Sequence, residues 1–124
     1  VSLSATYGDS AYWTNGLYKY DFNDPTANAE DGFDLDDIGG QMSIDPSFGS
    51  VTPKPGSSSS GISLASPSSF VEGSQNSITI ATSSSTTQTN SYWDIMGVGI
   101  LQSIPAGQKT GTYSINMTLT IIGN

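Results

Sequence analysis

The sequence predicts an all-β domain, and three observations support this prediction. The segment GTYSINMTLTIIG (residues 111–123) alternates apolar and polar side chains, which is the period of a half-buried strand. Turn signals such as Asn15-Gly16 and the Pro/Gly-containing stretch 104–111 separate other β-prone segments. No segment shows the apolar spacing of an amphipathic helix. A chain of 124 residues fits one domain. We therefore expect a single β-sandwich over residues 1–124, with seven or eight short strands and long polar loops.

The expected strands follow one another along the whole chain. Residues 1–7 alternate apolar and hydroxyl side chains from the first position. A hairpin at Asn15-Gly16 leads into a second strand over residues 17–22, and an acidic loop occupies residues 21–40. Further short strands are expected at residues 41–44, 61–65 and 76–82. Residues 92–102 carry apolar side chains on both faces, which predicts a long central strand, and 111–123 forms the last strand.

Composition argues against several classes of function. The formal charge is −8, and the chain has no His and no Cys. The chain has only three Lys and no Arg. These cations are too few to neutralise a phosphate backbone, so nucleic acid is not expected as a partner. Without His or Cys there is no Ser-His-Asp or Cys-His arrangement, so we expect no enzymatic activity. No apolar run reaches the roughly 20 residues that span a bilayer. The chain starts at Val1 rather than Met, as a mature secreted protein would.

The acidic loop is a candidate calcium site. Calcium takes six to eight oxygen ligands from carboxylates, amides and backbone carbonyls. Carboxylate and amide oxygens are concentrated in the loop, and the candidate ligands are Asp21, Asn23, Asp24, Asp31, Asp34, Asp36 and Asp37. The spacing does not match an EF-hand, because Pro25 stands at a ligand position. The alternative is a solvated acidic loop without a metal; no other cofactor is expected.

Two further features bear on ligands and modification. Tyr12-Trp13 and Tyr92-Trp93 are the only Tyr-Trp pairs, and an exposed Trp13 or Trp93 would stack on sugar rings. Neighbours in a strand point opposite ways, so the alternative is that one ring of each pair belongs to the core. Asn116 opens an Asn-Met-Thr sequon and faces away from the apolar stripe, which makes it a candidate for N-glycosylation.

Two motifs carry a resemblance to a known group of domains. The segment IPAGQKTGTYSINMTLTI (residues 104–121) resembles the last hairpin of immunoglobulin-like domains in bacterial and archaeal surface proteins, and FGSVTP (residues 48–53) is similar to another segment of these modules. The resemblance extends from about Phe48 onward, and the paired cysteines of some pilin families are absent. It implies an immunoglobulin-like sandwich and an extracellular, cell-surface location. It also implies a structural role in a filament, pilus or surface layer, in which one subunit donates a strand to the next.

The N-terminal segment is the candidate donor strand. Val1, Leu3, Ala5 and Tyr7 form one apolar stripe, and the segment contains no charged side chain or Pro to protect an edge. Strand addition to a second copy of the chain requires such a stripe, and it would produce a homopolymer. The alternative is that residues 1–7 form the first strand of the domain's own sheet. A second hypothesis for the whole chain is a secreted module that binds carbohydrate or a surface receptor.

Overall fold

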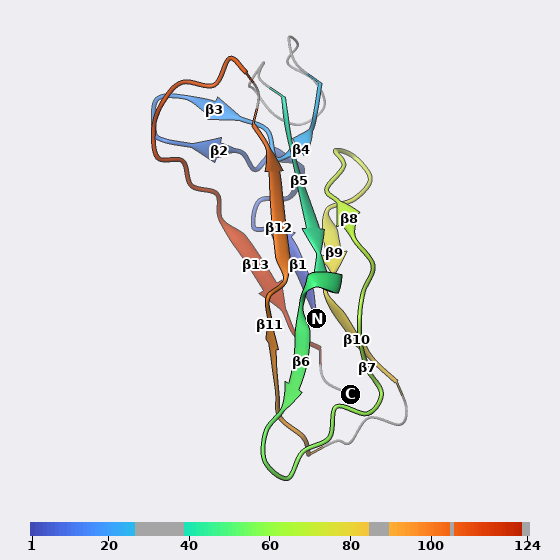
Figure 1. Ribbon diagram of the computed structural model, residues 1–124. Coiled ribbons are helices and arrows are strands. Elements are labelled where there is room, and N and C mark those ends of the chain that lie inside the picture. Colours follow the sequence, from blue (N-terminus) through green and yellow to red (C-terminus); the bar gives the residue numbers. More distant parts are fainter. Residues whose placement is uncertain (27–38, 85–89, 105, 123–124) are drawn as a thin grey trace.

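The fold is all-β in the computed structural model, which describes residues 1–26, 39–84, 90–104 and 106–122 (Figure 1). Thirteen short strands and two single-turn 3-10 helices, η1 (Gly8–Ser10) and η2 (Pro46–Phe48), make up the regular structure of these residues. All strand pairs are antiparallel. No helix in the described ranges has the length and apolar character needed to cross a membrane.

One layer of the sandwich is built around the N-terminal strand. β1 (Ser2–Ala5) lies between β13 (Met117–Thr120) and β9 (Ser77–Thr79). The chain continues from β9 into β10 (Ala81–Ser83), which pairs with β7 (Ile62–Leu64). First and last strands of the chain are therefore direct neighbours, as Figure 1 shows.

The other layer is built around β5 (Gly40–Asp45), which lies in front of β1 and β9 in Figure 1. β5 pairs along its length with β12 (Gly99–Ser103), and on its other side with β4 (Asn23–Asp24) and β8 (Ser68–Ser69). β11 (Trp93–Met96) pairs with β6 (Ser50–Pro53). The hairpin of β2 (Trp13–Thr14) and β3 (Lys19–Tyr20) forms a separate two-stranded sheet.

The core lies between the two layers. β5 alternates buried and half-buried residues, and it contributes Met42 and Ile44, whereas β9 contributes Ile78. Phe22 and Phe70 are fully buried, and their ring centroids lie 5.2 Å apart. Burying such side chains provides about 25 cal/mol for each Å² of apolar surface removed from water. The predicted strands at residues 1–7, 41–44 and 61–65 are present as β1, β5 and β7, and the hairpin at Asn15-Gly16 is present as β2 and β3. The single strand predicted over residues 76–82 is instead two strands, β9 and β10, which pair with β1 and β7.

Other strand predictions are also wrong in extent. The strand predicted over residues 17–22 is only the two-residue β3, and the described residues form thirteen short strands where seven or eight were expected. Residues 92–102 form two strands, because Gly97 adopts a φ of +75° and the chain changes partner from β6 to β5 at that point. Neither strand is the covered central strand that we expected, since Leu101 remains 54% exposed. The C-terminal strand is also shorter than predicted. Its regular part covers four residues, and upstream of it only Ser114 forms an isolated bridge, to Thr14.

Candidate functional site

The N-terminal strand is held on both edges by its own chain. Leu3 lies opposite Leu119 of β13 and Ile78 of β9. The Val1 ammonium donates a hydrogen bond to the Ala81 carbonyl at 2.8 Å, and the Ile80 N–H donates to the Val1 carbonyl at 2.8 Å. Within one chain, residues 2–5 therefore form the first strand of the domain's own sheet, which is the second of the two alternatives for this segment.

Val1, Leu3 and Ala5 face the core as the apolar stripe predicts, but Tyr7 does not. Tyr7 lies beyond β1 and is 67% exposed. Gly8 follows with a φ of +63°, and no atom of the described structure lies within 4 Å of where its Cβ would be. Such a φ is accessible to Gly at little cost. A short segment that is exposed at Tyr7 therefore connects β1 to the rest of the domain. The next residue in the core is Ala11.

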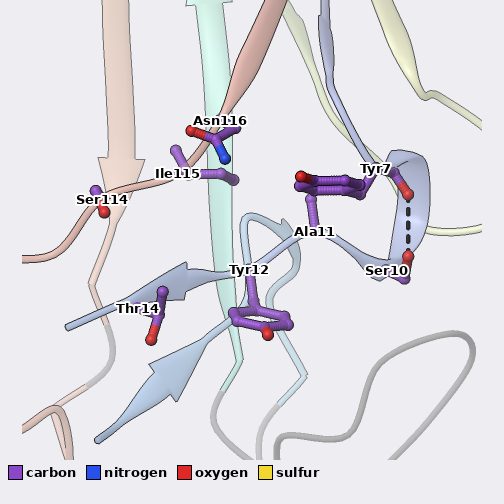
Figure 2. A pocket seen from close by; sticks show the side chains of 8 residues that line it. All are labelled: Tyr7, Ser10, Ala11, Tyr12, Thr14, Ser114, Ile115 and Asn116. Carbon is purple, nitrogen blue, oxygen red and sulfur yellow. Dashed lines mark hydrogen bonds between the residues drawn. The ribbon is translucent and has the colours of Figure 1, made fainter. Parts of the chain in front are cut away.

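This connecting segment borders a pocket of about 400 Å³ (Figure 2). The rings of Tyr7 and Tyr12 flank the hollow in Figure 2, and side chains from the segment before β13 line it from the other side. No charged side chain is among the lining residues, which are Tyr7, Ser10, Ala11, Tyr12, Thr14, Ser114, Ile115 and Asn116.

The polar groups of the pocket are neutral. The Ser10 hydroxyl donates to the Tyr7 carbonyl at 3.0 Å, and the Thr14 hydroxyl accepts from the Gly16 N–H at 2.9 Å. The Lys19 ammonium lies 4.2 Å from the centroid of the Tyr12 ring and so steadies this ring by a cation–π contact. An aromatic surface beside neutral hydroxyl and amide groups suits an uncharged ligand with its own hydroxyl groups. No sequence signal indicates this pocket, because residues 7–14 and 114–116 are adjacent only in the folded chain.

Both tryptophans are half-buried, and each indole N–H is engaged within the domain. Trp13 donates to the Gln102 side-chain oxygen at 2.9 Å, and its ring stacks on Tyr20 with centroids 6.0 Å apart. Trp93 donates to the Ser58 carbonyl at 2.6 Å. Its neighbour Tyr92 is 74% exposed, so Trp93 is the inward member of that pair.

Tyr20 joins Trp13 to the C-terminal segment. Its ring meets Tyr113 edge-on at a centroid distance of 5.3 Å. Burial raises the pKa of the Tyr20 phenol, because the phenolate loses hydration, and the nearby Tyr113 raises it further. Trp13 and Tyr20 thereby link β12, through Gln102, to the segment that leads to β13, through Tyr113.

The candidate calcium ligands fall into two groups. Asp21 and Asn23 are each 1% exposed, and the Asp24 carboxylate accepts the Thr26 N–H at 2.7 Å. Asp31, Asp34, Asp36 and Asp37 lie outside the described residues. Across the described ranges, no three His, Cys, Asp or Glu side chains lie close enough together to hold a metal ion. Calcium binding stays a prediction.

Asp9 contacts the region of Asn23, although it is not among the calcium ligands predicted from the sequence. Its carboxylate accepts hydrogen bonds from the side-chain amides of Asn23 at 3.3 Å and Asn76 at 2.9 Å. Asp9 thereby links η1 to β4 and to the segment before β9. The side-chain oxygen of Asn23 is buried and has no hydrogen-bond partner in the described part of the chain. No sequence signal pairs Asp9 with residues so distant.

Asn116 is exposed, and Thr118 of the same sequon contacts Thr6 through a hydroxyl–hydroxyl distance of 3.0 Å. The acceptor amide is therefore accessible at the mouth of the pocket, and its glycosylation stays a prediction. Comparisons with protein-family models, curated proteins and solved structures found no match.

Proposed function

We propose that this chain is a structural subunit of an extracellular filament, pilus or surface layer, and that subunits are joined by exchange of β1. One observation carries the proposal. β1 is the central strand of the sheet β13-β1-β9, yet only the short segment through Tyr7 and Gly8 connects it to the rest of the domain.

Exchange of a central strand costs little free energy once a partner is present. The hydrogen bonds of β1 to β13 and β9, and the core contacts of Val1, Leu3 and Ala5, are the same whether β1 comes from its own chain or from another. Removal of β1 leaves a groove between β13 and β9 that is shaped for this strand. Backbone pairing supplies the affinity and the alternate apolar side chains set the register. When each chain inserts its β1 into the next chain along a line, the product is a homopolymer.

The proposal can be tested with one pair of cysteines, since the chain has none of its own. Ser4 lies opposite Ser77. Because the Val1 carbonyl accepts from the Ile80 N–H, the Ser4–Ser77 pair falls at a non-hydrogen-bonded position, where Cα atoms are about 4.5 Å apart and a disulfide fits. In the double variant Ser4→Cys/Ser77→Cys, this disulfide forms within one chain if β1 pairs in the sheet of its own chain. It forms between chains if β1 is exchanged.

The expected result is a ladder of disulfide-linked oligomers on a non-reducing gel after oxidation of the concentrated protein. The matched control is Ile62→Cys/Ser83→Cys, a pair that is also at a non-hydrogen-bonded position and that joins β7 to β10 within one chain whatever β1 does. If the Ser4–Ser77 disulfide gives monomers only, at every protein concentration at which the chain assembles, exchange of β1 is wrong.

The pocket favours a second candidate function, the binding of neutral carbohydrate. The observation is the pairing of two tyrosine rings with uncharged polar groups in a hollow of about 400 Å³. This function uses Tyr7 and Tyr12, in place of Trp13 and Trp93. Tyr12→Ala should abolish binding of neutral oligosaccharides in calorimetry, whereas Tyr92→Ala, at an exposed ring that does not line the pocket, should leave it unchanged. Equal binding by both variants excludes this site.

A further inference from the structure

The sandwich leaves core-facing side chains uncovered on one side, where β12 ends one sheet. Ile100 of β12 lies directly opposite Ile44 of β5. Residues opposite each other in an antiparallel pair point to the same face of the sheet. Ile44 is 0% exposed in the core, but Ile100 is 64% exposed. Ile100 therefore faces the core side of its sheet without being covered.

In the other layer, the exposure of core-facing side chains also increases toward one edge of the sheet. Ile78, Leu3 and Leu119 lie side by side across β9, β1 and β13, and they share the core-facing side of their sheet. Ile78 is 1% exposed, Leu3 is half-buried and Leu119 is 58% exposed. The core-facing side chains are therefore less covered toward β13, which lies on the same side of the molecule as β12 in Figure 1. We call β13 and Ile121, which follows it, the open edge.

The backbone of the open edge is ready to pair with another strand. The Thr6 N–H donates to the Asn116 carbonyl, which fixes the register so that the backbone groups of 116, 118 and 120 point toward β1. Those of Met117, Leu119 and Ile121 then point outward, and β13 has no strand partner other than β1 within the described ranges. Natural edges are usually protected by charge, proline or a bulge. Residues 115–122 contain no charged residue and no proline.

Charge indicates what covers this edge. The chain has eleven acidic residues, and the last of them is Asp94. Beyond Asp94 the only charged side chain is Lys109. Two copies of a chain with a net charge of −8 repel each other over most approaches, but the open edge itself contains no carboxylate. If the partner strand is β13 of a second copy, its apolar stripe lies against the apolar stripe of the open edge.

We propose that β13 pairs antiparallel with β13 of a second copy about a two-fold axis centred on Leu119. This register places Leu119 opposite its own copy and Met117 opposite Ile121 of the second copy, and the outward backbone groups of all three residues are then satisfied. A two-fold axis perpendicular to the sheet keeps core-facing side chains on one side, so the two copies of Leu119 cover each other. The contact joins chains side by side, and it does not depend on exchange of β1.

The experiment uses a chain in which β1 cannot be exchanged. The Ser4→Cys/Ser77→Cys variant is refolded at high dilution and oxidised, so that the disulfide traps β1 within its own sheet, and the monomer is then concentrated. We expect sedimentation equilibrium to show a reversible dimer. Leu119→Lys places two like charges opposite each other and removes the apolar contact between the two leucines, so Kd should rise about tenfold or more.

Leu17→Lys is the matched control, because Leu17 is an 85% exposed leucine in the β2–β3 turn, away from the open edge. It should leave Kd unchanged. In the otherwise cysteine-free chain, Leu119→Cys should form a disulfide-linked dimer under mild oxidation much faster than Leu17→Cys. This second measurement needs no destabilising charge, so it still decides the proposal if Leu119→Lys fails to fold. A trapped chain that stays monomeric, or equal rates for the two single cysteines, overturns the open-edge contact and leaves exchange of β1 untouched.

Discussion

β5 and β13 have the same kind of sequence and opposite environments. Both alternate apolar and polar residues, as in Met42-Ser43-Ile44 and Met117-Thr118-Leu119. In β5 the apolar residues are 2% and 0% exposed, whereas Leu119 in β13 is 58% exposed. β5 has strands on both sides, and β13 is paired only with β1 in the described structure. Alternation therefore determines which side chains share a face, and neighbouring strands determine whether that face is covered.

The largest expected effect comes from truncating the same kind of side chain in each strand. Ile44→Ala should lower the free energy of unfolding by about 2–5 kcal/mol, because it removes buried contacts and leaves a cavity. Leu119→Ala should cost about 0.5 kcal/mol or less, as expected for an exposed site. Urea unfolding of dilute protein measures both. Equal losses would contradict the contrast between β5 and β13.

Calcium should stabilise the folded chain through the acidic loop of residues 21–40, which leads from β4 to β5 in the sequence. A ligand bound only to the folded state adds about 2.7 kcal/mol at one hundred times its Kd, so the melting temperature should rise with calcium and fall with EDTA. Asp36→Asn should reduce this rise, and Asp45→Asn, at an acidic residue of β5 outside the loop, should not. Identical melting curves in calcium and EDTA would show that the loop is only a solvated acidic surface.

The smallest effect concerns Tyr20 in β3 of the hairpin. Its pKa is raised in the folded state, so the unfolded chain loses this proton first, near the ordinary tyrosine value of about 10. Stability should therefore fall as the pH rises above about 10. Tyr20→Phe should reduce that alkaline loss, measured by urea unfolding at several pH values. Tyr92→Phe, which removes an exposed phenol, is the control; the same slope in both variants would exclude this role for Tyr20.

Local signals predicted the local structure well. Asn15 accepts the N–H groups of Leu17 and Tyr18 through its side chain, and Gly16 adopts a φ of +90°, so the expected hairpin depends on those two residues. Around Gly97 the sequence predicted one long strand over residues 92–102. The structure shows two strands, because the partner changes there, and a Cβ on Gly97 would lie only 3.4 Å from the Phe48 carbonyl oxygen.

The sequence by itself determined the all-β class, the hairpin, the N-terminal strand and the shared face of apolar residues within a strand such as β1 or β5, because turn chemistry and a period of two act between near neighbours. The tertiary structure alone decided that β1 lies between β13 and β9, that Tyr7 and Tyr12 border one pocket with Asn116, and that Leu119 is exposed. These facts depend on strand order. Strand order comes from pairing between residues as far apart in the sequence as Ser2 and Thr120, and the alternation in one strand does not indicate which strand is its partner.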